Sequence, residues 1–261
     1  MKLKSTIFAF SAALTLTGCS TVADITGSSS MQLNADAESS YSQIKAVEQI
    51  ETNTATARRV QAIFNRMRPF ADAANETGMK FNWEIVTIRS DKLNAWAMPG
   101  GKMAVYTGIV EKLKLTDDEL AAIIGHEMAH ALKEHSKKQA GQQVLTGLAK
   151  KYGTQLLQAK TNINASHIDL GADLLSEYGL DKPYSRSHET EADRLGVLLM
   201  AQAGYNPQSA VTVWEKMKAQ SGKGNKLLSF MSTHPGHEAR IEAITKQLPE
   251  VMPIYEQAKK R

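Results

Sequence analysis

The sequence has 261 residues, of which 42% are hydrophobic and 22% are charged, a composition typical of a folded globular chain and unlike that of a disordered or fibrous one. Its 31 basic and 27 acidic residues give a formal net charge of +4, and the densest basic run, 133–138, is interrupted by Glu134, so we expect no nucleic-acid partner. The single cysteine, Cys19, excludes an intrachain disulfide and a thiolate-bound metal cluster.

The N-terminus has the layout of a secretory signal. Two lysines precede an apolar stretch over 7–16, which is shorter than the roughly 20 residues that a membrane-spanning helix needs. The sequence Leu-Thr-Gly-Cys that ends at Cys19 resembles the bacterial lipobox, whose cysteine is lipidated and becomes the first residue of the mature chain. We therefore expect a lipoprotein signal peptide over 1–18 and a lipid on Cys19; the alternatives are a plain cleaved signal and a buried core cysteine. Ser20 favours the outer membrane, by resemblance to Gram-negative lipoproteins.

Residues 20–38 are rich in serine, threonine, alanine, aspartate and glycine and carry no apolar period. This composition is typical of a flexible linker. We therefore expect a lipidated N-terminus and tether over 19–38, followed by a single folded domain over 39–261 that works close to a membrane.

The domain is predicted to be α+β and mainly helical, with one small sheet. Apolar positions recur at helical spacing across 41–75. The β-rich segment 82–88 comes next, followed by two short strands, 94–98 and 103–107, on either side of a turn over 99–102, which favours a small antiparallel sheet or hairpin. Further helices are expected over 117–130, 141–159, 168–178 and 187–203, and from Pro207 onwards.

The pentapeptide His-Glu-Met-Ala-His at 126–130 is an H-E-x-x-H motif within a predicted helix. Residues four apart share a helix face, so the imidazoles of His126 and His130 can bind one Zn²⁺ with an unstrained backbone. Glu127 lies beside them at the edge of an apolar stripe, where a partly desolvated carboxylate can act as the general base. The alternative is a chance match on an exposed helix. Gly125 argues against it, because glycine inside a helix costs ~1 kcal/mol unless another backbone comes close.

Two histidines leave the zinc site short of a third protein ligand. The metzincin spacing fails, because a lysine and a serine replace its glycine and third histidine. His135 lies about 140° from the ligand face of a continuous helix and is expected to be exposed. Glu189 is the best candidate, and Asp193, one turn further on the same face, can accept a hydrogen bond from a ligating imidazole. Gly196 on this face would allow close helix packing; a solvated acidic face is the alternative.

Four segments, in this order, resemble a zinc metallopeptidase family. They are Asn94 to Met103, the motif with Gly125 before it, Glu189 to Asp193, and Thr233-His234-Pro235 with Arg240. The family includes the CAAX prenyl endopeptidases, the HtpX heat-shock proteases, the mitochondrial Oma-type proteases and the BepA- and LoiP-like proteins, and the chain resembles most the LoiP/YcaL-type outer-membrane lipoproteins. The resemblance implies a zincin-like (gluzincin) metallopeptidase domain, endopeptidase activity, one Zn²⁺ per chain and Glu189 as the third ligand.

His234 is a candidate for a role near the metal, because it lies in the Thr-His-Pro match. It could stabilise the oxyanion while Glu127 passes the proton of the attacking water to the leaving amine. It could instead bind zinc as a fourth ligand and silence the site when substrate is absent. A helix-cap or surface histidine is the structural alternative.

The strand around Met103, Ala104 and Val105 is predicted to be an edge strand that pairs with extended substrate; a purely structural hairpin is the alternative. Such pairing needs an unfolded segment, so the family resemblance and the expected tether favour misfolded or unassembled envelope proteins as substrates, cut at the outer membrane on its periplasmic side. A zinc-stabilised lipoprotein chaperone for outer-membrane proteins, without proteolysis, is one rival, and the intact Glu127 argues against it. A zinc amidase acting on cell-wall peptides is another.

Overall fold

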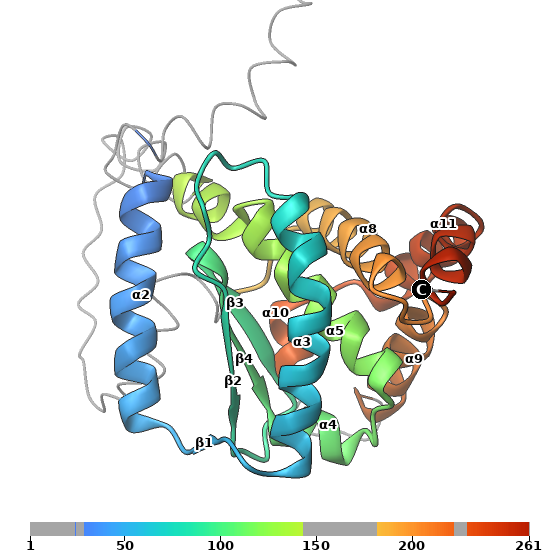
Figure 1. Cartoon of the computed structure of the whole chain (residues 1–261), viewed down its shortest axis with the longest axis horizontal. Helices are drawn as coiled ribbons and strands as arrows, with labels where there is room; N and C mark the ends of the chain where they lie inside the picture. Colours follow the sequence, from blue (N-terminus) through green and yellow to red (C-terminus); the bar gives the residue numbers. More distant parts are fainter. Residues whose placement is uncertain (1–23, 25–28, 143–181, 222–228, 261) are drawn as a thin grey trace, which may run out of the picture.

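The computed structural model describes residue 24 and residues 29–142, 182–221 and 229–260 (Figure 1). The predicted signal peptide and Cys19 lie outside these residues, as do the helix expected over 168–178 and nearly all of the one expected over 141–159. In the described ranges, helices pack around one small sheet, which confirms the mainly helical α+β class.

Helix α2 (Ser30–Val47) covers one face of the sheet (Figure 1). It begins after Ser29, whose side chain accepts a hydrogen bond from the backbone of Gln32. Its buried side chains, Tyr41 among them, pack against the sheet, and the Tyr41 hydroxyl donates to the carbonyl of Met103 at 2.8 Å. The prediction of a flexible tether through residue 38 is therefore wrong for 30–38, because this segment forms the first half of α2 and buries Ala37 in the domain.

Four short strands form a mixed sheet in the order β1-β2-β4-β3. The strands are β1 (Ile50–Glu51), β2 (Glu84–Ile88), β3 (Ala95–Met98) and β4 (Lys102–Tyr106). β2 runs parallel to β4, while β1 pairs with β2 and β3 pairs with β4 in antiparallel fashion. The predicted hairpin is thus present as β3 and β4, within a sheet that also contains a parallel pair.

The prediction that Met103, Ala104 and Val105 belong to an edge strand is wrong. All three residues lie in β4, which pairs with β2 on one side and with β3 on the other. Both rows of backbone groups in β4 are therefore used within the sheet. Among the strands of the described residues, β1 and β3 are the two edges of the sheet, and β3 pairs with β4 alone.

The turn between β3 and β4 is a short 3₁₀ segment, η1 (Pro99–Gly101), and it requires glycine. Gly101 has φ +83°, and a Cβ there would lie 2.5 Å from Cε3 of Trp83. Both the left-handed backbone and the close approach exclude larger residues. The turn predicted from the Pro-Gly-Gly sequence is confirmed.

Helices α3 (Ala55–Ala73) and α5 (Asp117–Leu132) cover the opposite face of the sheet and enclose the main core (Figure 1). The helical pattern expected across 41–75 is divided by β1 into α2 and α3. The short α4 (Thr107–Lys112) leads into α5, which opens with a reciprocal capping box between Thr116 and Glu119.

Helices α8 (Arg186–Gln202) and α9 (Ser209–Ser221) pack on α5, and α11 (His237–Ala258) packs on both of them. The short α10 (Ser229–Thr233) lies near the sheet (Figure 1), where the backbone N–H of Phe230 donates to the carbonyl of Leu93. Helices α5 and α8 meet at Gly125 and Gly196. A Cβ added to Gly125 would lie 2.7 Å from the carbonyl oxygen of Gly196, and a Cβ added to Gly196 would lie 2.7 Å from the backbone nitrogen of His126. The close approach predicted from these two glycines is confirmed. Each helix within the described ranges is too short or too polar to cross a bilayer.

Candidate metal-binding active site

The two histidines of the H-E-x-x-H motif point into one buried site on α5. Nε2 of His126 and Nε2 of His130 are 3.0 Å apart, as expected for residues four apart on one helix face. Burial lowers the pKa of His126 to about 4, helped by the Arg240 charge, and lowers the pKa of His130 as well. Both rings are therefore neutral at pH 7, which is the form that binds a metal ion.

Glu189 reaches the same point from the first turn of α8. Its carboxylate oxygens lie 3.6 Å from Nε2 of His126 and 3.5 Å from Nε2 of His130. Burial alone would raise the pKa of Glu189, but the charge of His234 and hydrogen bonds from His130 and His234 lower it below its ordinary value. The structure thus brings the predicted third ligand to the two imidazoles as a carboxylate.

His234, just after α10, completes the cluster. Its Nδ1 lies 3.3 Å from Nε2 of His126 and 3.1 Å from Oε1 of Glu189. Its Nε2 lies 3.4 Å from Oε1 of Glu127. The alternative of a surface histidine is therefore wrong, because the ring is 2% exposed and stands between the metal-binding groups and the predicted base.

The cluster fits a zinc ion. One ligand atom from each of four residues lies within 4.8 Å of the others, and these residues are His126, His130, Glu189 and His234. Zinc–ligand distances of ~2.0–2.1 Å in a tetrahedron place neighbouring ligand atoms about 3.3 Å apart. The two imidazole nitrogens are 3.0 Å apart, and the distances from His126 to Oε2 and from His130 to Oε1 of Glu189 are 3.6 and 3.5 Å, all close to this value. Two neutral imidazoles and one carboxylate are also a donor set that zinc prefers.

Glu127 has the properties of a general base. Its Oε1 is buried and has no hydrogen-bond partner among the described residues. Burial raises the pKa of Glu127 to about 7, an effect that the nearby Glu189 charge reinforces and the His234 charge opposes. A carboxyl group with a pKa near neutrality can both accept and release a proton at physiological pH.

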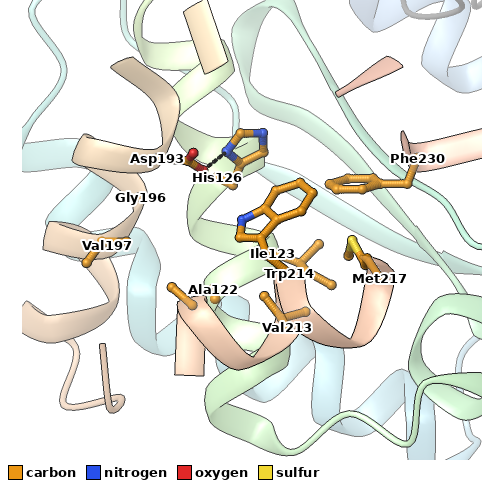
Figure 2. Close-up of a pocket in the computed structure, with 11 residues that line it drawn as sticks. Ala122, Ile123, His126, Asp193, Gly196, Val197, Val213, Trp214, Met217 and Phe230 are labelled. Atoms are coloured by element: carbon orange, nitrogen blue, oxygen red, sulfur yellow. Dashed lines mark ion pairs between the residues drawn. The ribbon is translucent and has the colours of Figure 1, made fainter. Parts of the chain in front are cut away.

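Asp193, the residue expected to accept a hydrogen bond from a ligating imidazole, lies beside His126. Nδ1 of His126 lies 3.0 Å from Oδ1 of Asp193 (Figure 2). Arg240 fixes this carboxylate by donating from Nε and Nη2 at 2.6 Å each, and it also contacts Glu189 through Nη1. The guanidinium lies 3.6 Å from the ring centroid of Trp214, which lines a small apolar pocket beside His126 (Figure 2).

His135 is buried, so the prediction of an exposed residue is wrong. Helix α5 ends at Leu132, and Glu134 adopts a left-handed backbone with φ +50° before the chain resumes a helical course. This turn brings Nδ1 of His135 to 2.9 Å from Nδ1 of His130. The 140° offset assumed a continuous helix, and nothing in the local sequence marks the left-handed residue.

Tyr184 is a site residue that sequence reasoning did not identify. Its ring stacks on that of His130, with centroids 4.2 Å apart, and its hydroxyl is hydrogen-bonded to Ser136 at 3.1 Å. Its backbone N–H donates to the carbonyl of Thr233 at 3.0 Å, which ties the segment before α8 to α10. Tyr184 lies outside the four segments on which the family resemblance rests, so no sequence signal pointed to it.

Sequence comparison relates the chain to known peptidases. The pattern of peptidase family M48 matches residues 54–248. The chain is 39% identical to the mitochondrial metalloendopeptidase OMA1 of Schizosaccharomyces pombe over 171 residues, 64% of this chain and 47% of that protein. It is 28% identical to the metalloprotease LoiP of Escherichia coli over 260 residues, 95% of this chain and 98% of that protein. The beta-barrel assembly-enhancing protease of Escherichia coli is 22% identical over 71% of this chain and 38% of its own length. The chain thus spans about half the length of the yeast OMA1 relatives.

Proposed function

The chain belongs to peptidase family M48, and from this premise we propose that it is a zinc metalloendopeptidase that works at the bacterial outer membrane, facing the periplasm, on misfolded or unassembled envelope proteins. The convergence of His126, His130 and Glu189 beside a buried Glu127 oxygen that accepts no hydrogen bond among the described residues is the observation that carries the catalytic part of the proposal. The envelope location rests on the sequence around Cys19 and on similarity to LoiP along nearly its whole length.

In the proposed reaction, His126, His130 and Glu189 hold the zinc ion. When bound there, zinc lowers the pKa of a water molecule and polarises the peptide carbonyl. Glu127 takes the proton from the attacking water and delivers it to the nitrogen of the leaving amine, so the base is restored at the end of the cycle. Its burial and raised pKa suit both transfers.

His234 has two candidate roles in this scheme. Its Nε2, 3.4 Å from Glu127, is close enough to the reacting groups to donate to the oxyanion of the tetrahedral intermediate. Its Nδ1, 3.3 Å from the zinc-facing nitrogen of His126, could instead occupy the fourth coordination position until substrate arrives. Activity of His234→Ala separates the two: a fall indicates an oxyanion donor, and a rise indicates an inhibitory ligand.

The membrane part of the proposal is a signal peptide over 1–18 and a lipid on Cys19. The tether is then limited to residues before Ser30, because α2 begins there. With two or more acyl chains the attachment would be effectively permanent. Cys19→Ala should release the protein from washed membranes and abolish incorporation of labelled palmitate. Retention of both in the variant would contradict the lipid anchor.

The test of catalysis uses the full-length chain purified in detergent with zinc. We expect it to cleave unfolded casein, and to lose that activity in Glu127→Gln and after treatment with a chelator. Glu256→Gln is the matched control, because it makes the same chemical change at an exposed position of α11. Glu127→Gln with wild-type activity would overturn the proposed base. Cleavage of cell-wall peptides without cleavage of casein would contradict protein substrates.

A further inference from the structure

The two zinc-facing histidines are supported in different ways on their outer sides. His126 meets a carboxylate directly, since its Nδ1 lies 3.0 Å from Asp193. His130 meets a second imidazole: its Nδ1 lies 2.9 Å from Nδ1 of His135. The other nitrogen of His135, Nε2, lies 3.0 Å from Oε2 of Glu191.

With zinc on Nε2 of His130, these contacts assign a position to each proton. A neutral imidazole that binds a metal through Nε2 carries its proton on Nδ1. His130 must therefore donate from Nδ1, and Nδ1 of His135 must accept. His135, as a neutral ring, then carries its own proton on Nε2 and donates it to Glu191. Every nitrogen in the chain of contacts thus has one defined role.

We propose that His135 and Glu191 are positioning residues that fix the ring orientation and the tautomer of His130 for zinc. The inference rests on the proposed role of His130 as a zinc ligand. It extends the familiar histidine–carboxylate support of a metal ligand by one inserted imidazole. Neither residue belongs to the cluster that would hold the zinc ion.

The surroundings are built to hold His135 in this orientation. The ring is fully buried and stacks on His188, with centroids 4.4 Å apart and planes 15° from parallel. Glu134 keeps a left-handed backbone that is unfavourable for a residue with a side chain, and this conformation turns His135 back toward α5. Lys138 lies 3.5 Å from Oε2 of Glu191 and supports the carboxylate from outside.

Zinc affinity is the decisive measurement, made on the full-length apoprotein by competition with a coloured chelator. His135→Phe keeps a flat ring but removes the acceptor, and we expect zinc binding to weaken about 10- to 100-fold. His135→Gln offers an amide oxygen to His130 and an amide N–H to Glu191, so it should recover most of the affinity. Glu256→Gln should bind zinc as the wild type does.

A role in packing alone makes a different prediction. It would leave the zinc affinity of folded His135→Phe unchanged, or would lower it equally in His135→Gln, and either result overturns the proposal. If His135→Phe does not fold, the decision passes to Glu191→Ala and Glu191→Gln, whose site is part-exposed. The alanine variant should bind zinc more weakly than the glutamine variant, which retains an acceptor oxygen; equal affinities would overturn the proposal.

The tautomers provide a second readout. Nitrogen-15 spectra of histidine-labelled zinc protein should show His130 protonated on Nδ1 and His135 protonated on Nε2. A proton on Nδ1 of His135 would overturn the relay. Failure here is distinct from failure of the proposed function, because the latter would appear as absence of zinc binding in the wild type itself.

Discussion

The contact between Gly125 and Gly196 should be decisive for the geometry of the zinc site. In Gly196→Ala, the new Cβ would lie 2.7 Å from the backbone nitrogen of His126. Backbone atoms cannot rotate away, so restoring an ordinary 3.4 Å contact requires α5 and α8 to separate locally by about 0.7 Å. Glu189 is carried by α8 and the two histidines by α5, so this separation acts directly on the three ligands.

The expected effect on activity is larger than the effect on stability. Overpacking costs ~1–3 kcal/mol, and the better helix propensity of alanine returns ~1 kcal/mol, so the net loss should be about 0–2 kcal/mol. Displacement of catalytic groups by ~1 Å can reduce the rate about 100-fold. We therefore expect kcat/KM of Gly196→Ala on casein to fall about 10- to 100-fold, with weaker zinc binding, while the free energy of unfolding in urea falls by no more than about 2 kcal/mol.

Gly78→Ala provides the matched control. Gly78 has φ +75°, but nothing lies within 4 Å of the position that a Cβ would take, so alanine there costs only the ~1–2 kcal/mol of a left-handed backbone. It should lose stability and keep full activity. If Gly196→Ala retained wild-type activity and zinc affinity, the reasoning from helix separation would be refuted.

Two further predictions concern charged groups. Burial opposes ionisation of Glu119, but Lys216 and the helix cap lower the pKa of Glu119 below its ordinary value. The ionised carboxylate therefore stabilises the folded state at pH values above the unfolded pKa of ~4.3, and this stabilisation is lost as the pH falls through the pKa of the folded state. Glu119→Gln should therefore cost ~1 kcal/mol at pH 7 and less at pH 3 in thermal unfolding; equal costs would contradict this. Arg240→Met leaves Asp193 and Glu189 without their buried cation and should destabilise the apoprotein by about 3–5 kcal/mol in urea. A loss under ~1 kcal/mol, as for a surface ion pair, would contradict the buried network.

The parts of the site that the sequence predicts are those set by helix phase. His126 and His130 share a face because they are four apart, and Asp193 follows Glu189 by the same spacing. Gly125 and Gly196 then indicate which faces of the two helices meet. Short-range periodicity therefore predicts the histidine pair and the support of His126, whereas the choice of Glu189 as third ligand also rests on the family resemblance.

The remaining features depend on long-range contacts or on single backbone angles. His135 reaches His130 only because Glu134 is left-handed, and left-handed glutamate has no sequence signal. The position of β4 inside the sheet depends on its parallel pairing with β2. The local sequence of neither strand indicates that the two pair with each other. The start of α2 does carry a signal, since Ser29 is a favourable N-cap, but the polar composition of 20–38 obscured it.

The most direct test of the account is an anomalous-scattering map from crystals of the zinc-loaded protein. We expect one zinc peak per chain, about 2.0–2.1 Å from Nε2 of both His126 and His130 and about 2.0–2.2 Å from a carboxylate oxygen of Glu189. A zinc peak outside this cluster, or one bound by the two histidines with Glu189 turned away, would contradict the account.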